Sequence, residues 1–202
     1  MKLADLDKNG YQLFEQLSHN EIGLFIKPYL FKKNRAIYFY WIFNFLVWAG
    51  IIMGIFTSSI GIIKSFDFFS LGILGMLPLI PIHELIHGLF YKLAGAPTVS
   101  YKANFKKFIF YAMADKFITD QKNFVRLALA PFIVINSILI ISILLSSGII
   151  SFLLAGILFI HTAGCAGDFA LVSYFIENDG RNLVTYDDVS KGESYFYKKI
   201  AY

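Results

Sequence analysis

The feature that most constrains the fold is a run of 21 residues without a charged side chain, residues 36–56. A helix of this length can cross the hydrocarbon core of a bilayer. Further apolar stretches occupy residues 71–94, 124–145 and 149–176, and 57% of the whole chain is hydrophobic while only 16% is charged. A soluble domain could not bury so much apolar surface. We therefore predict an all-α integral membrane protein with four transmembrane helices.

The distribution of basic residues predicts the orientation of the chain. All 18 Lys and Arg residues except Lys64 lie before the first apolar run, between Lys92 and Arg126, or after the fourth run. Because cytoplasmic segments are enriched in Lys and Arg, we expect both termini in the cytoplasm. The expected location is a bilayer such as the bacterial cytoplasmic membrane. The net charge of +4 is too small to suggest a nucleic-acid partner.

The apolar runs divide the chain into three parts. Residues 1–35 are expected to form a cytoplasmic amphipathic segment. Residues 36–176 are expected to form the four-helix membrane domain, and residues 177–202 a cytoplasmic tail that is either a binding segment or a disordered end. Between the second and third runs, residues 99–111 are β-prone. We predict a short cytoplasmic-side hairpin there, with an interfacial loop as the alternative.

A short amphipathic helix is predicted within residues 1–35. Leu13, Phe14 and Leu17 have the spacing of one helix face. Residues 18–21, with the sequence Ser-His-Asn-Glu, have the spacing of a capping box before Ile22.

One short motif inside the second apolar run carries chemistry. Residues 83–87 read His-Glu-Leu-Ile-His. On a helix, this spacing puts His83 and His87 on one face, at a separation that suits a single Zn²⁺. Glu84 can then reach a metal-bound water and take its proton. Ionisable groups inside a bilayer are costly unless they are paired, so we predict a zinc cofactor with Glu84 as the catalytic base.

Two histidines leave zinc one protein ligand short of a catalytic set of three. A third ligand can be a histidine six residues after His87, but that position is Leu93. It can also be a downstream glutamate, but no Glu occurs from residue 88 to residue 175. Asp168 lies eight residues before the end of the last run, level with the histidines, whereas His161 lies about one to two turns deeper. We predict Asp168 as the third ligand. The other candidates are His161, Asp115 and Asp120.

Three further residues are judged by their place on the predicted helices. His161 precedes Asp168 by seven residues and shares its face, so it is expected to support a ligand or bind an oxyanion, or to replace Asp168 if the helix is shifted or broken. Asn136 is expected either to hold the substrate or to bond two helices. Cys165 lies about 60° from Asp168 around the helix, and we expect it to pack rather than to bind metal.

These features together resemble the site-2 protease class of intramembrane metalloproteases. The resemblance covers about residues 70–176: the His-Glu-x-x-His helix, the β-prone segment, the Leu-Ala-Leu-Ala-Pro sequence of residues 127–131, and Asp168. More closely, the chain is similar to small bacterial membrane proteins described as putative zincin peptidases. Site-2 proteases carry their aspartate in a Leu-Asp-Gly context, which differs from Gly167-Asp168-Phe169 here. The resemblance implies a zinc protease that cleaves within or beside the membrane, without naming a substrate. We expect the substrate to be a membrane protein or peptide.

The expected function is therefore a zinc-dependent peptidase that uses a metal-activated water within or beside the membrane. The main alternative is a non-hydrolytic zinc-binding membrane protein, such as a sensor or carrier. Glu84 separates the two, because a carrier has no need of a general base at that position. A structural anchor or chaperone is the third possibility, and it predicts that His83 and His87 are dispensable. The sequence leaves the oligomeric state open.

Overall fold

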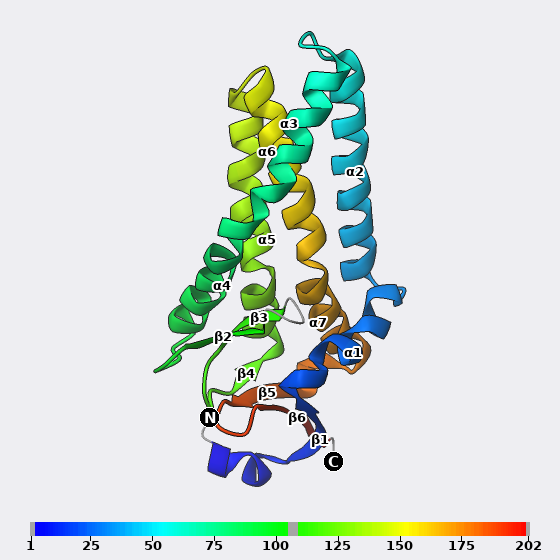
Figure 1. The fold of residues 1–202 in the computed structure, drawn as a ribbon. Helices are drawn as coiled ribbons and strands as arrows, with labels where there is room; N and C mark the ends of the chain where they lie inside the picture. Colours follow the sequence, from blue (N-terminus) through cyan, green and yellow to red (C-terminus); the bar gives the residue numbers. More distant parts are fainter. Residues whose placement is uncertain (1–2, 105–108, 201–202) are drawn as a thin grey trace.

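The computed structural model describes residues 3–104 and 109–200 (Figure 1). The chain is mostly helical, and its long helices form an elongated bundle with the strands gathered at one end (Figure 1). The helices are α1 (Ile22–Ile26), α2 (Arg35–Thr57), α3 (Ile62–Leu74), α4 (Met76–Leu93), α5 (Gln121–Leu145), α6 (Ile149–Gly164) and α7 (Ala166–Glu177). The strands are β1 (Tyr11–Ser18), β2 (Ser100–Asn104), β3 (Ile109–Met113), β4 (Thr119–Asp120), β5 (Leu183–Asp188) and β6 (Glu193–Lys199).

Two of the predicted apolar helices form with almost the predicted bounds. α2 begins after Asn34, whose side chain accepts a hydrogen bond from the Ile37 backbone N–H and so caps the helix. α5 begins after Asp120, which caps the Asn123 N–H in the same way at 2.8 Å. Both helices extend through their apolar runs without interruption, although α5 contains Pro131, which has no backbone N–H to donate.

The second apolar run is bent rather than straight. α3 begins nine residues before the predicted start at position 71, and it meets α4 at Gly75 with a bend of 46°. α3 lies against α6, where a Cβ at Gly72 would overlap the Leu153 carbonyl and a Cβ at Gly156 would overlap the Phe69 carbonyl. The crossing therefore depends on two glycines that let the backbones approach closely.

The fourth apolar run is also interrupted. α6 ends at Gly164 and α7 begins at Ala166, with Cys165 between them. As a result Asp168 lies in the first turn of α7 rather than in the middle of one long helix. The predicted continuous helix over residues 149–176 is thus two helices.

Three segments are long and apolar enough to cross a membrane: α2, α5, and α6 together with α7. The bent pair α3 and α4 makes a fourth if it counts as one span. Four transmembrane helices therefore remain a prediction. α2 exposes large apolar side chains along most of its length, among them Phe39, Trp41, Phe45, Leu46, Met53 and Phe56.

The chain is mostly helical, as predicted, but it is not all-α, because four strands form an antiparallel sheet with the order β1-β6-β5-β4. The residues assigned to an amphipathic helix, Leu13, Phe14 and Leu17, lie in β1. Leu17 is buried, whereas Leu13 and Phe14 are both exposed, and the pairing of β1 with β6 shifts register between Leu13 and Glu15. β1 pairs with β6, so the tail is a folded part of the molecule rather than a disordered end. A strand partner almost 190 residues away decides this local structure, since Tyr11 lies opposite Lys199.

A hairpin follows the second run, and its predicted location on the cytoplasmic side stays a prediction. β2 and β3 pair antiparallel, with Ser100 opposite Met113 and Asn104 opposite Ile109. The predicted segment 99–111 also includes residues 105–108, which lie outside the described residues. The hairpin follows α4 directly, and β3 packs against that helix.

An aromatic core fixes α7 between the sheet and the bundle. Tyr174 and Phe175, on α7, are fully buried and pack against Phe196 of β6 and Phe124 of α5. The Tyr174 hydroxyl donates a hydrogen bond to Glu15 Oε2, on β1, at 2.9 Å. The folded N-terminal strand and tail therefore hold the helix that carries Asp168.

Candidate metal centre

α4 presents His83 and His87 on one face, four residues apart. Both side chains are buried, and their Nε2 atoms lie 3.1 Å apart. Asp168, from the first turn of α7, reaches both rings. Its Oδ2 lies 3.3 Å from His83 Nε2 and its Oδ1 lies 3.4 Å from His87 Nε2. The three residues predicted as metal ligands thus converge on one point, although 72 residues of the chain, 94–165, separate α4 from α7.

Hydrogen bonds at Nδ1 of His83 and His87 determine that Nε2 of each ring faces the convergence point. His87 Nδ1 lies 2.9 Å from the Leu127 carbonyl oxygen, which can only accept, so Nδ1 carries the proton. His161 Nδ1 donates in the same way to Asn136 Oδ1 at 2.7 Å, which leaves His161 Nε2 to accept from His83 Nδ1 at 3.2 Å. When neutral, His83 and His87 therefore both turn an unprotonated Nε2 toward Asp168.

This donor set fits zinc. Two imidazole lone pairs and a carboxylate face one another without a hydrogen between them, an arrangement that repels unless a cation lies among them. In a tetrahedral site with zinc–ligand bonds of about 2.0–2.1 Å, ligand atoms lie about 3.3 Å apart. The observed separations of 3.1, 3.3 and 3.4 Å agree with that spacing.

His161 and Asn136 lie behind the histidines of α4, as supports. His161 is fully buried, and Asn136 is 2% exposed. The chain of hydrogen bonds from Asn136 through His161 to His83 fixes the orientation of the His83 ring. Asn136 was expected either to hold the substrate or to bond two helices. Its contact with His161 is a hydrogen bond between two helices, because α5 carries Asn136 and α6 carries His161.

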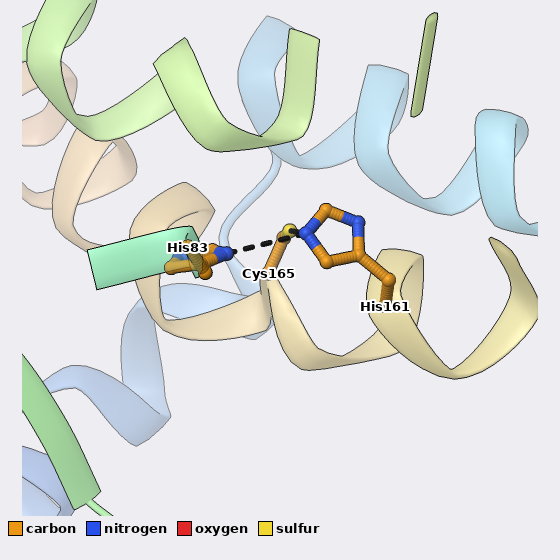
Figure 2. A group of neighbouring side chains, drawn as sticks. All are labelled: His83, His161 and Cys165. Atoms are coloured by element: carbon orange, nitrogen blue, oxygen red, sulfur yellow. Dashed lines mark hydrogen bonds between the residues drawn. The ribbon is translucent and has the colours of Figure 1, made fainter. Parts of the chain in front are cut away.

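Cys165 lies closer to the centre than its predicted packing role requires. Its Sγ lies 3.9 Å from His161 Nε2, and Figure 2 shows His83, His161 and Cys165 as neighbours. These three residues form a second group that could hold a metal ion, and the two groups share His83. The sequence prediction placed Cys165 only by its angle from Asp168 around the helix, and that angle does not indicate a position near the centre. The spacing of four between His161 and Cys165 does indicate one, because residues at that spacing share a helix face.

Glu84 lies beside the convergence point, in a cavity of ≈ 320 Å³. His83, Glu84, His87 and Asp168 all line this cavity. Glu84 Oε2 is buried, and within residues 3–104 and 109–200 it has no hydrogen-bond partner. An unsatisfied buried carboxylate oxygen is costly, so its presence beside the ligand set points to a bound group that completes it.

The other predicted ligand candidates have structural roles elsewhere. Asp115 Oδ1 accepts a hydrogen bond from the Val189 N–H at 2.9 Å, and Asp120 caps α5. Neither belongs to a group of residues that could hold a metal ion in the described part of the chain. Sequence reasoning did not find the Leu127 carbonyl or the cavity wall formed by β5 and β6, because neither has a signal in residue type or spacing.

Comparison with known proteins gives a family for this arrangement. Residues 76–179 match a family described as "Putative zincin peptidase". The match begins at the first residue of α4 and ends just after α7, so it includes all four residues around the convergence point. No curated protein and no solved structure matched the chain. Because the matched region covers half of the sequence, the chain belongs to this zincin-like metallopeptidase family, whose members are expected to bind zinc.

Proposed function

We propose that this protein is a zinc-dependent peptidase that cleaves peptide bonds within or beside a membrane. The observation that carries the proposal is the convergence of His83, His87 and Asp168 in one cavity, next to Glu84, whose Oε2 has no hydrogen-bond partner among the described residues. Membership in a zincin-like family supports the peptidase class. The resemblance to site-2 proteases supports the intramembrane setting.

Each polar residue around the centre has a separate part in this proposal. His83, His87 and Asp168 hold the metal, while the Leu127 carbonyl and His161 hold the two imidazole rings in place. When bound, zinc would lower the pKa of a water molecule and polarise the peptide carbonyl. Fixed rings matter because a ligand set that can rotate binds metal more weakly.

Glu84 moves the proton. Its carboxylate takes a proton from the attacking water and then delivers it to the nitrogen of the leaving amine. Oε2 is suited to this step because no protein donor occupies it in the described part of the chain. The buried surroundings of α4 and β3 limit competing bulk water, which strengthens the electrostatic effect of the carboxylate.

The hairpin offers a way to hold the substrate. β3 packs against α4, and the Ala112 backbone lies beside Glu84. A substrate strand added to the hairpin would be extended, with its carbonyl groups accessible, whereas a helical substrate shields them in its own hydrogen bonds. We propose strand addition here as the mode of binding.

The proposed location is an integral membrane position with the sheet in the cytoplasm. The exposed apolar side chains of α2 and the apolar segments of α5, α6 and α7 support insertion. The strands and both chain ends lie at one end of the bundle (Figure 1), and the Lys and Arg distribution favours the cytoplasm for that end.

A comparison of the wild-type protein with Glu84→Gln, in which an amide replaces the carboxylate, tests the function. Cells that express the wild-type protein should contain shortened membrane peptides that are missing from cells with Glu84→Gln. Quantitative proteomics of new peptide termini in the membrane fraction measures this difference. Glu21→Gln, which removes an exposed carboxylate from the N-cap of α1, serves as the matched control. Identical peptides in wild-type and Glu84→Gln cells, with zinc bound to both proteins, would favour the sensor or carrier instead.

A further inference from the structure

The cavity that holds the candidate metal centre has a second polar wall, formed by the sheet. Asp187 of β5 and Ser194 of β6 line the same cavity as Glu84. Tyr91, on α4, also lines this cavity. A peptide bound in the cavity can therefore contact Glu84 and Asp187 together.

A relay of hydrogen bonds orients the Asp187 carboxylate. The Ser194 hydroxyl donates to Asp187 Oδ1 at 2.6 Å, and His19 Nε2 lies 3.2 Å from the Ser194 oxygen. Because the serine proton goes to the carboxylate, the serine oxygen accepts from His19 Nε2–H. His19 Nε2 also lies 3.6 Å from Asp187 Oδ1. The relay therefore ends on one carboxylate oxygen of Asp187, Oδ1, which accepts the Ser194 proton.

The second oxygen of Asp187 is open to the cavity. In the part of the chain that the structure describes, Asp187 Oδ2 has no hydrogen-bond donor and no Lys or Arg partner. The side chain is 18% exposed although its neighbour His19 is 6% exposed. Because Asp187 lines the cavity and its Ser194 bond occupies only Oδ1, the other oxygen is available to a donor on a bound molecule.

The walls around Asp187 suit a cation on an apolar stem. Tyr111, Tyr186 and Phe117 line the cavity. Burial, together with the Asp187 charge, raises the pKa of Tyr111, so its hydroxyl stays neutral and adds no competing negative charge. Aromatic rings contact both the methylene groups and the charged end of Lys and Arg favourably.

We infer that Asp187 forms a substrate subsite that binds a cationic nitrogen of the peptide, from a Lys or Arg side chain or from a free amino terminus. The inference rests on the proposed function, which places a peptide in this cavity. The side-chain source has independent support, because the cytoplasmic segments next to membrane spans are rich in Lys and Arg. A subsite at the cytoplasmic end of the bundle would meet those residues first.

Peptide capture tests the subsite without requiring hydrolysis. The full-length, zinc-loaded Glu84→Gln protein is immobilised in nanodiscs of zwitterionic lipid. It is offered acetylated decapeptide pools, random except for Lys, Arg or norleucine at one central position. A fourth pool has norleucine and a free amino terminus. Mass spectrometry measures the retained peptides. We expect at least one cationic pool to be retained roughly tenfold more than acetylated norleucine peptides, the effect of one charge-assisted hydrogen bond.

A second substitution in the Glu84→Gln protein tests whether Asp187 causes the preference for cationic peptides. Asp187→Asn keeps the size of the side chain and its bond to Ser194, and it should abolish the preference for cationic pools. Asp7→Asn, which changes an exposed carboxylate outside the cavity, should retain it. Equal retention of all pools, or the same preference in Asp187→Asn, overturns the subsite. Those results leave the proposed peptidase standing, whereas identical peptides in wild-type and Glu84→Gln cells overturn the peptidase but not a measured preference.

Discussion

At the scale of single residues, the candidate centre depends on the ring behind His83. His161→Ala removes the acceptor for His83 Nδ1, so the His83 ring loses its fixed orientation. We expect zinc affinity to fall by roughly 10–100-fold, the usual effect of losing such a support. Competition with a chelating dye on the purified protein measures this affinity.

Cys165→Ala is the matched variant for that measurement. Cys165 contacts the same His161 nitrogen at 3.9 Å but is not a member of the His83, His87 and Asp168 group. We expect its zinc affinity to equal that of the wild type. A loss as large as that of His161→Ala would place the metal in the group of His83, His161 and Cys165 (Figure 2).

Asp168→Asn tests the third ligand. The substitution keeps the shape of the side chain but removes the charge that balances two imidazole lone pairs and a divalent ion. Elemental analysis of the purified protein should find zinc well below one equivalent, while Glu84→Gln should retain it. Full zinc occupancy in Asp168→Asn would contradict the predicted ligand set and shift attention to His161.

At the scale of elements, the sequence was most informative where local pattern alone decides the structure. α2 and α5 follow from apolar runs of helical length, and β2 and β3 lie in or next to the β-prone segment. β1 was mistaken for a helix because its partner β6 lies at the other end of the chain. The bend at Gly75 and the break at Cys165 come from packing between helices, which apolar runs do not encode.

In the candidate site too, the residues predicted from local spacing differ from those that only the packing of distant segments brings together. His83, Glu84 and His87 follow from spacing on one helix, and Asp168 was selected by depth in a helix that proved to be broken. The selected residue still reaches the histidines, because the break puts it in the first turn of α7, facing α4. Asp187 could not be anticipated, since only the pairing of β5 with β6 brings it to the cavity.

The crossing of α3 and α6 gives a prediction at the same scale. Gly72→Ala places a Cβ into the Leu153 carbonyl, so the helices must separate. We expect a loss of about 1–3 kcal/mol in stability, seen as a lower Tm in detergent. Gly50→Ala, on the exposed face of α2, meets no atom within 4 Å and should leave the Tm unchanged or slightly raised. Equal Tm values for the two variants would show that the close approach does not occur.

At the scale of the whole molecule, the tail completes the fold. Removal of residues 178–202 deletes β5 and β6, leaves β1 unpaired and uncovers the aromatic side chains of α7. We expect the truncated protein to lose protease resistance and bound zinc, although every predicted metal ligand is still present. Limited proteolysis and elemental analysis measure both, with removal of residues 201–202 as the control. A truncated protein that still binds one zinc would support a tail with no structural role.

The proposed topology can be tested through the cysteine content of the chain. Cys165 is the one cysteine in the sequence, and it is fully buried, so an introduced cysteine supplies the labelling signal. Ser147 belongs to the turn between α5 and α6, and Ser190 to the turn between β5 and β6. The turn between α5 and α6 lies at the end of the bundle away from the sheet (Figure 1). In intact bacterial cells, a membrane-impermeant maleimide should label Ser147→Cys but reach Ser190→Cys only after lysis. The opposite pattern would invert the orientation and remove the support that Lys-rich and Arg-rich cytoplasmic segments give to the Asp187 subsite. Labelling of both positions in intact cells would contradict a protein that separates its two ends across a membrane.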